Sequence, residues 1–91
     1  MNYKVYVLES EKNGLRYVGH TQDLVNRLKE HNANRTASTQ GKGPWKLIYS
    51  EDFSSLKLAK NREKFFKTGR GRIVLKNHIG AVRDFRGSPD L

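Results

Sequence analysis

The sequence YVGHTQDLVNRLKEH at residues 17–31 joins a strand pattern to a helix pattern. We expect the strand to end at a break at Gly19, and the helix to start where Thr21 can cap its first backbone donors. The side chains at helical spacing that would face a core are Leu24, Val25 and Leu28. A strand that runs through glycine into a capped helix places side chains from both elements around one opening.

Several side chains in this stretch can act on an anion. Arg27 and His31 are four residues apart, so they share one edge of the helix beside the apolar stripe. Tyr17 adds a phenol and His20 a second imidazole. Arg27 on its own is typical of a surface cation, and His31 fits a helix-end hydrogen bond as well as a phosphate contact.

Composition narrows the class of protein. The chain has 91 residues, enough for one small domain, with 18 Lys plus Arg against 9 Asp plus Glu and a net charge of +9. Such a field usually serves attraction to a polyanion. The absence of cysteine excludes disulfides and cysteine-based zinc sites. The apolar run at residues 5–8 is too short for a signal peptide or a membrane span, so we expect a cytoplasmic protein with no membrane partner.

The first half of the chain outside this stretch predicts strands. Residues 3–8 alternate loosely and are rich in β-branched and aromatic residues, and Asn13-Gly14 is a reversal signal before a returning strand at 16–18. Tyr6 and Tyr17 could then lie on one face of the hairpin. A basic loop follows over residues 32–43.

The second half predicts one more strand and two helices. Residues 45–49 form a third strand, and Ser54 or Ser55 can cap a helix that runs to about Thr68 and stops at Gly69. A short helix covers 72–78. The order is β-β-α-β-α-α and the fold class is α+β, with a domain over residues 1–80 and a polar C-terminal tail over 81–91.

Glu63 is the single acidic residue between residues 53 and 83, a segment with nine basic residues. Its helical spacing to Ala59 and Phe66 places it at the margin of the core-facing side. A carboxylate there requires a partner. That partner is either a neighbouring base such as Lys60 or Lys67, or a hard cation such as Mg²⁺ held against a phosphate.

The ordered set of motifs resembles the GIY-YIG endonuclease family, in particular its short stand-alone members, and is similar to the nuclease domain of that family found in excinuclease. The resemblance covers about residues 3–79. The matching segments are Val5-Tyr6, Tyr17-Val18-Gly19, Arg27, His31-Asn32, Trp45 to Tyr49 and Ala59-Asn61-Arg62-Glu63. The first motif departs from the family in reading Lys4-Val5-Tyr6, and His20 stands where many members have lysine or a small residue.

The resemblance implies a three-stranded antiparallel sheet flanked by helices and a one-metal phosphodiesterase site acting on DNA, or on RNA. In that site Glu63 would hold Mg²⁺ or Mn²⁺, and Arg27 would bind the non-bridging oxygens. Tyr17, with Tyr6 beside it, would take a proton from the attacking water. The other implied or adjacent site residues are His20, His31 and Asn77.

Exposed cations would bind the nucleic-acid backbone or, in the plainer interpretation, form a solvated face. The residues assigned to nucleic-acid binding are Arg27, Arg35, Lys42, Lys60, Lys64, Lys67, Arg70, Arg72 and Asn77. Three functions fit the sequence: a metal-dependent DNA endonuclease, a non-catalytic nucleic-acid-binding module, and a domain that binds an acidic protein. The chain has no room for a separate recognition domain, so we expect cutting selected by DNA structure; at family level the pathway is repair or recombination.

Overall fold

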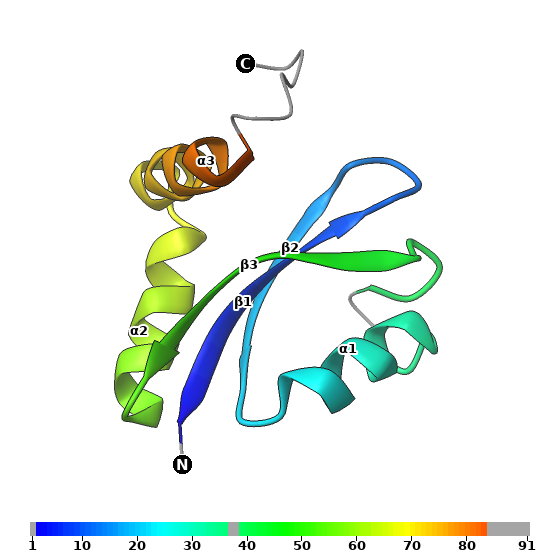
Figure 1. The fold of residues 1–91 in the computed structure, drawn as a ribbon, viewed down its shortest axis with the longest axis horizontal. Coiled ribbons are helices and arrows are strands. Elements are labelled where there is room, and N and C mark those ends of the chain that lie inside the picture. The colour runs from blue at the N-terminus through cyan, green and yellow to red at the C-terminus, as the bar shows by residue number, and fades with distance from the viewer. Residues whose placement is uncertain (1, 37–38, 84–91) are drawn as a thin grey trace.

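A computed structural model describes residues 2–36 and 39–83, with the side chains described as far as Ile79. Its elements are β1 (Tyr3–Ser10), β2 (Arg16–Thr21), α1 (Leu24–Asn32), β3 (Trp45–Phe53), α2 (Leu56–Phe66) and α3 (Gly69–Arg83). The predicted α+β class and the order β-β-α-β-α-α are confirmed (Figure 1). The greater part of the predicted C-terminal tail, residues 84–91, lies outside the described residues.

One antiparallel sheet forms the centre of the molecule, with strand order β2-β1-β3. In its register Tyr6 is opposite Gly19 and Leu8 is opposite Tyr17. The β1–β2 hairpin reverses at Asn13–Gly14 as predicted, with Gly14 at φ 75°. β2 is an edge strand, so no strand covers its outer side. Side chains from the two faces of the sheet can come close to each other there.

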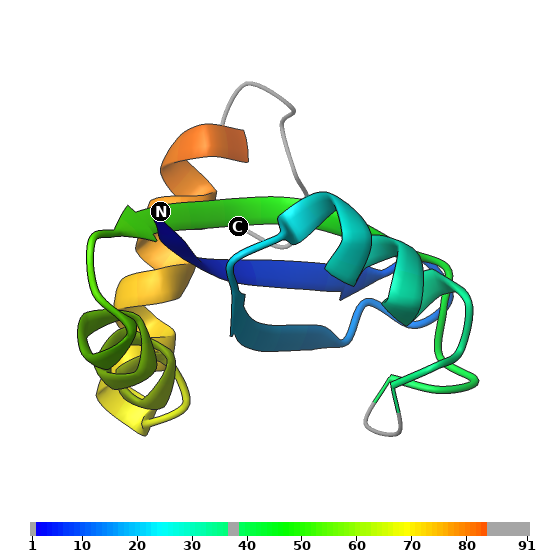
Figure 2. The ribbon, with the colours of Figure 1, turned by 90° about the horizontal axis from the view of Figure 1, so that it is seen from below.

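Helices cover both faces of the sheet, as Figures 1 and 2 show. Val5 and Val7 point to one face, where they pack against α2 and α3 through Ala59, Phe66 and other apolar residues. Their neighbours Tyr6 and Leu8 point to the opposite face, where Leu24 and Leu28 of α1 and the buried Trp45 cover them. The alternation of side chains along β1 therefore produces two small cores rather than one.

The start of α1 differs from the prediction. Asp23 caps the helix by accepting a hydrogen bond from the Asn26 backbone at 3.1 Å, whereas the Thr21 hydroxyl accepts from the Asp23 backbone outside the helix. Because the helix begins three residues after Thr21, its apolar side is narrower than predicted. Leu24 and Leu28 face the core, but Val25 is 68% exposed.

The two C-terminal helices also begin and end differently. Ser55 caps α2 as predicted, but the helix ends at Phe66. Gly69 does not stop this helix; it opens α3, because the Thr68 hydroxyl accepts a hydrogen bond from the Gly71 backbone at 3.0 Å and so satisfies the new helix start. α3 then extends to Arg83, well beyond the short helix predicted over 72–78. No helix in the described part of the chain is long and apolar enough to span a membrane.

Candidate active site

Gly19 does not break its strand, contrary to the prediction; β2 continues through it to Thr21. Its role is steric. A Cβ atom at this position would lie 2.6 Å from the hydroxyl oxygen of Tyr6 and 3.0 Å from the ring of Tyr17. Real Cβ atoms do not approach other atoms as closely as 2.6 Å. The missing side chain therefore opens the space in which the Tyr6 hydroxyl lies.

The two tyrosines share one face of the sheet, as the hairpin pattern predicted. The register places Tyr6 opposite Gly19 and two residues from the partner of Tyr17, and the two rings lie 6.3 Å apart between centroids. Their accessibility differs. Tyr6 is buried, with 1% of its surface exposed, whereas Tyr17 is half-buried at the edge strand.

His31, in the last turn of α1, is fully buried and connects Tyr6 to the loop that follows the helix. Its Nε2 atom lies 2.9 Å from the Tyr6 hydroxyl and its Nδ1 atom 2.8 Å from the Thr39 hydroxyl. Of the two predicted roles, the helix-end hydrogen bond is the one present, because His31 lies in the last turn of α1 and contacts Thr39, and its ring is buried rather than open to a phosphate. The ring acts as an internal bridge between the sheet and the loop. Thr39 itself carries no motif signal in the sequence.

The hydrogen-bond donors of this chain of contacts can be ordered. The Thr39 hydroxyl is 3.4 Å from the Thr36 carbonyl, an acceptor, so it donates there and accepts from His31 Nδ1–H. His31 Nε2 then accepts the hydrogen bond donated by the Tyr6 hydroxyl. Burial and the nearby Arg27 charge lower the pKa of His31, which keeps the ring in the neutral form that this arrangement needs.

Arg27 reaches the same hydroxyl from α1. The pKa of Arg27 is raised, mainly by its hydrogen bond to Tyr6 and next by its hydrogen bond to Glu30. Its ion pair with Glu30 measures 2.9 Å, and 36% of its side chain is exposed. Burial raises the pKa of Tyr6 to about 12, and the hydrogen bond from Arg27 only partly opposes this. Tyr6 is therefore a protonated phenol at neutral pH, held between a guanidinium and an imidazole.

Glu63 approaches from α2, on the other face of the sheet. Its carboxylate accepts a hydrogen bond from His20 Nδ1 and forms an ion pair with Lys67 Nζ at 2.6 Å. The structure therefore contains one of the predicted lysine pairs, with Lys67 and not Lys60, but also brings His20 to the acid. Burial opposes ionisation, but the hydrogen bonds from His20 and Lys67 outweigh it and lower the pKa of Glu63.

The two groups of side chains meet at the free edge of β2. His20 follows Gly19 directly, so its side chain points to the α2 face while the Tyr6 hydroxyl lies over Gly19 on the α1 face. Burial is the main cause of the raised pKa of Tyr6, and the charges of Tyr17 and, less, of Glu63 add to it.

The donor set at Glu63 fits one hard divalent cation. Mg²⁺ is commonly bound by one or two carboxylates, with waters and substrate phosphate oxygens completing its shell. Within the described residues no group of three or more His, Cys, Asp or Glu side chains forms a metal cage. Glu63 is the carboxylate at this edge, and its partner Lys67 is 52% exposed and free to turn outward. The site can therefore provide a single carboxylate ligand, with the remaining positions left to water and phosphate.

The remaining predicted residues lie around this site or away from it. Arg35 and Lys42 are exposed in the loop after α1, and a row of exposed cations follows α2 into α3, namely Lys60, Lys64, Lys67, Arg70 and Arg72. Asn77 is exposed on α3 and makes no side-chain hydrogen bond to the described residues. His78 stacks on Tyr49 with ring centroids 5.6 Å apart, in a structural role.

Two cations were not singled out from the sequence. Arg16 at the start of β2 and Lys76 on α3 both line a pocket beside Tyr17, together with Lys67 and Arg72. Arg16 stands directly before the tyrosine of the second motif, and Lys76 is four residues after Arg72. The second spacing is a signal for one helix side. The position of Arg16 gives no such signal in the sequence, because only the fold brings it into the same pocket as the residues of α3.

Comparison with known proteins finds a family, relatives and a solved structure similar to this chain. The family model of the GIY-YIG catalytic domain matches residues 2–77. A UPF0213 protein of Clostridium perfringens is 43% identical over 68 residues, which are 74% of this chain and 71% of the relative. A UPF0213 protein of Streptococcus agalactiae is 42% identical over 64 residues, 69% of this chain and 72% of the relative. The solution structure of a UPF0213 protein from Bacillus halodurans has a TM-score of 0.53 and 32% identity, and covers 85% of this chain and 84% of that one.

Proposed function

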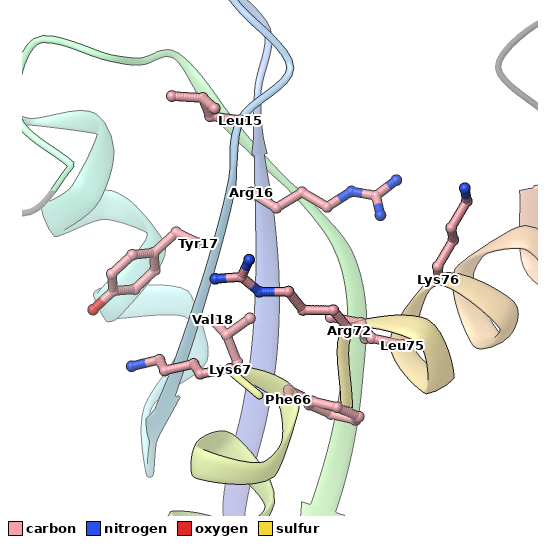
Figure 3. A pocket seen from close by; sticks show the side chains of 9 residues that line it. All are labelled: Leu15, Arg16, Tyr17, Val18, Phe66, Lys67, Arg72, Leu75 and Lys76. Atoms are coloured by element: carbon pink, nitrogen blue, oxygen red, sulfur yellow. The ribbon is translucent and has the colours of Figure 1, made fainter. Parts of the chain in front are cut away.

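The chain belongs to the GIY-YIG catalytic domain family, and on that premise we propose that it is a metal-dependent endonuclease that hydrolyses a phosphodiester bond in DNA. The observation that carries the proposal is that Tyr6 and Tyr17 meet at Gly19, that Arg27 interacts with Tyr6, and that Glu63 contacts His20, the residue after Gly19. Two phenols and a guanidinium lie on one face of the sheet, and a carboxylate reaches its free edge from the other. Figure 3 shows Tyr17 at this same edge.

Arg27 is the phosphate-binding group in this proposal. Its planar donors match two non-bridging oxygens of a phosphodiester. About a third of the side chain is exposed, and its ion pair with Glu30 at 2.9 Å holds one side of the guanidinium. The substrate phosphate would then lie between Arg27 and the edge of β2, with Glu63 on its far side.

Tyr17 is the proposed base that takes the proton of the attacking water. The buried Tyr6 is unsuited to this role, because its pKa is raised to about 12 and its hydroxyl already donates to His31. Tyr17 is more accessible, because it is only half-buried and lies on the edge strand at the margin of an open pocket. Tyr6 then acts as a fixed acceptor and spacer for Arg27, while its own hydroxyl proton is donated to His31.

Glu63 is the proposed metal ligand, and Mg²⁺ or Mn²⁺ the proposed cofactor. The bound ion would neutralise charge on the phosphate and stabilise the departing 3′ oxygen. His20 donates a hydrogen bond to the other side of the same carboxylate, which orients it as outer-shell partners orient metal ligands elsewhere.

A non-catalytic nucleic-acid-binding module is the second candidate, and one observation favours it. Both oxygens of Glu63 are engaged by protein groups, His20 and Lys67. If these pairs persist in solution, the carboxylate is unavailable to a metal. The net charge of +9 would then support salt-sensitive binding without cleavage.

A cleavage panel separates the two candidates. Single-stranded, duplex, branched and flapped DNA, with RNA of the same sequences, are incubated with and without Mn²⁺, beside the Glu63→Ala variant. The endonuclease proposal requires metal-dependent products that disappear in Glu63→Ala while its circular dichroism is unchanged. Cleavage that persists in this variant, or salt-sensitive binding with no cleavage of any substrate, would overturn it.

A further inference from the structure

A pocket of about 700 Å³ opens between the edge strand β2 and the helices α2 and α3. Figure 3 shows its lining: Leu15, Arg16, Tyr17 and Val18 come from β2 and the residue before it, and the others from the end of α2 and from α3. This volume is large enough for one nucleotide and falls within the range typical of small-molecule sites. The strand and the helices lie far apart in the sequence, so only their packing creates it.

Four cations surround this pocket and no acidic side chain lines it. They are Arg16, Lys67, Arg72 and Lys76. Arg16 is 3.5 Å from Glu9, and Lys67 pairs with Glu63. Arg72 and Lys76 have no ion-pair partner within residues 2–36 and 39–83. The rim therefore carries unneutralised positive charge, which suits an anionic ligand.

The floor of the pocket is apolar. Its accessible apolar surface comes from the half-buried Val18 and from Leu15, which is 52% exposed, while the lining residues Phe66 and Leu75 are buried in the core. A phosphate group alone would contact the cationic rim and leave the apolar surface exposed to water. The combination of an apolar floor and a cationic rim matches a ligand with one flat, weakly polar part and one anionic part, which is the chemistry of a nucleotide.

The pocket adjoins the proposed active site. Tyr17 belongs to its lining, although its ring points away from the four cations, toward α1 (Figure 3). Lys67 belongs to its rim and contacts Glu63. A strand whose phosphate lies between Arg27 and Glu63 would therefore bring the neighbouring nucleotide to this pocket.

We propose that the pocket binds one unpaired nucleotide next to the bond that is cut, with its base against Val18 and Leu15 and its phosphate on Lys76. This inference rests on the proposed function for its position relative to the cut. A paired duplex keeps its bases stacked inside and presents only sugar and phosphate, so it cannot fill the floor. The arginine guanidinium planes of Arg16 and Arg72 can cover the exposed side of the base.

The test compares two strands of equal charge in metal-free buffer, where nothing is cut. One is a short thymidine strand, and the other is an abasic deoxyribose-phosphate strand of the same length. Fluorescence anisotropy measures both affinities. Because one base–protein stacking contact contributes about 1–3 kcal/mol, we expect the thymidine strand to bind about tenfold more tightly. Equal affinities for the two strands would overturn the proposal.

Three variants locate that preference. Leu15→Ala removes an exposed wall and Arg72→Ala an exposed rim cation, so neither threatens the fold; both should reduce the preference to about twofold, since each lowers base contact. Lys57→Ala, an exposed α2 cation outside the pocket, should weaken both strands equally and leave the tenfold ratio unchanged. Loss of the ratio in Lys57→Ala, or its retention in both pocket variants, would overturn the assignment to this pocket.

The outcomes distinguish this pocket from the nuclease proposal. A base preference with no metal-dependent cleavage would leave the pocket standing and reject the nuclease. Cleavage by a protein without the preference would do the reverse. A duplex of the same length, added as a third ligand, should bind no better than the abasic strand after correction for its charge.

Discussion

Glu51 and Glu63 are equally exposed, each with 18% of its side-chain surface accessible, yet they meet different surroundings. Glu51 in β3 accepts hydrogen bonds from Arg62 at 2.8 and 3.1 Å and from Tyr49 at 2.6 Å. Both of its carboxylate oxygens therefore have hydrogen-bond partners within the protein. Both oxygens of Glu63 are also engaged, but by His20 of the edge strand β2 and by Lys67, which is 52% exposed. The two carboxylates form a matched pair for experiment.

Glu63→Gln should abolish cleavage and lower stability by at most about 1 kcal/mol, because it weakens an ion pair with the exposed Lys67. The change keeps the side chain's shape and its contact with His20 but removes the charge that a divalent cation needs, and loss of several kcal/mol of metal stabilisation corresponds to at least about a 100-fold fall in rate. Glu51→Gln should do the opposite, with cleavage per folded molecule retained and stability lowered by about 1–3 kcal/mol. Urea unfolding and cleavage rates measured on both variants check this. Equal activity of the two variants would contradict a special role for Glu63.

Tyr17→Phe and Tyr6→Phe each remove one hydroxyl, and we expect different defects. Without its base, Tyr17→Phe should cut about 100- to 10,000-fold more slowly and unfold at the same urea concentration as the parent. Tyr6→Phe leaves the buried His31 Nε2 without its donor, so it should also lose about 1–3 kcal/mol of stability. A Tyr6→Phe protein as stable as the parent would show that the Tyr6–His31 contact contributes little.

Gly19→Ala tests the close approach of the Tyr6 hydroxyl. The added methyl group must displace the phenol, at a cost of about 1–3 kcal/mol for overpacking. A displacement of that kind moves Arg27 as well, so cleavage should fall by about 100-fold. Gly69→Ala is the control, since a Cβ there meets nothing within 4 Å and helix propensity should leave stability equal or up to about 1 kcal/mol higher. Full activity of Gly19→Ala would refute the steric role.

Stability should fall on mild acidification because of His31. Burial and Arg27 lower its pKa in the folded protein, while in the unfolded chain it titrates near about 6.5. Between those two values the unfolded state binds more protons, so the free energy of unfolding decreases as the pH falls below about 6.5. The lowered carboxyl pKa values of Glu51 and Glu63 add a second loss below about 4.5. Urea unfolding across pH should show both steps.

His31→Gln should remove the first of these steps. The variant has no group that titrates at this position, so its stability should be lower near neutrality but should vary less between about pH 7 and about pH 5. The second loss, which comes from the carboxyls, should remain. An unchanged slope in the variant would mean that another group causes the mild-acid effect.

Local patterns in the chain predicted much of this molecule. The strand and helix order follows from alternating and helical spacing, and the hairpin follows from Asn13–Gly14, because turn chemistry acts between neighbours. The boundaries failed where two local signals competed. Asp23, not Thr21, caps α1. Gly69, the expected end of α2, instead begins α3, where the Thr68 hydroxyl accepts a hydrogen bond from the Gly71 backbone. Such choices depend on which backbone donors packing leaves unsatisfied.

The identities of Tyr6, Tyr17, Arg27 and Glu63 were readable from residue type and spacing, since each chemical role needs one kind of side chain. The contacts among these side chains could not be predicted from the sequence. Packing decided that Gly19 serves as a gap for the Tyr6 hydroxyl, that His31 is buried as a bridge to Thr39, and that His20 holds Glu63. It also created the pocket between β2 and α3. The physical reason is that a chain fixes contacts between close neighbours by its own spacing, whereas contacts between distant residues exist only once the two small cores have been buried on either face of the sheet.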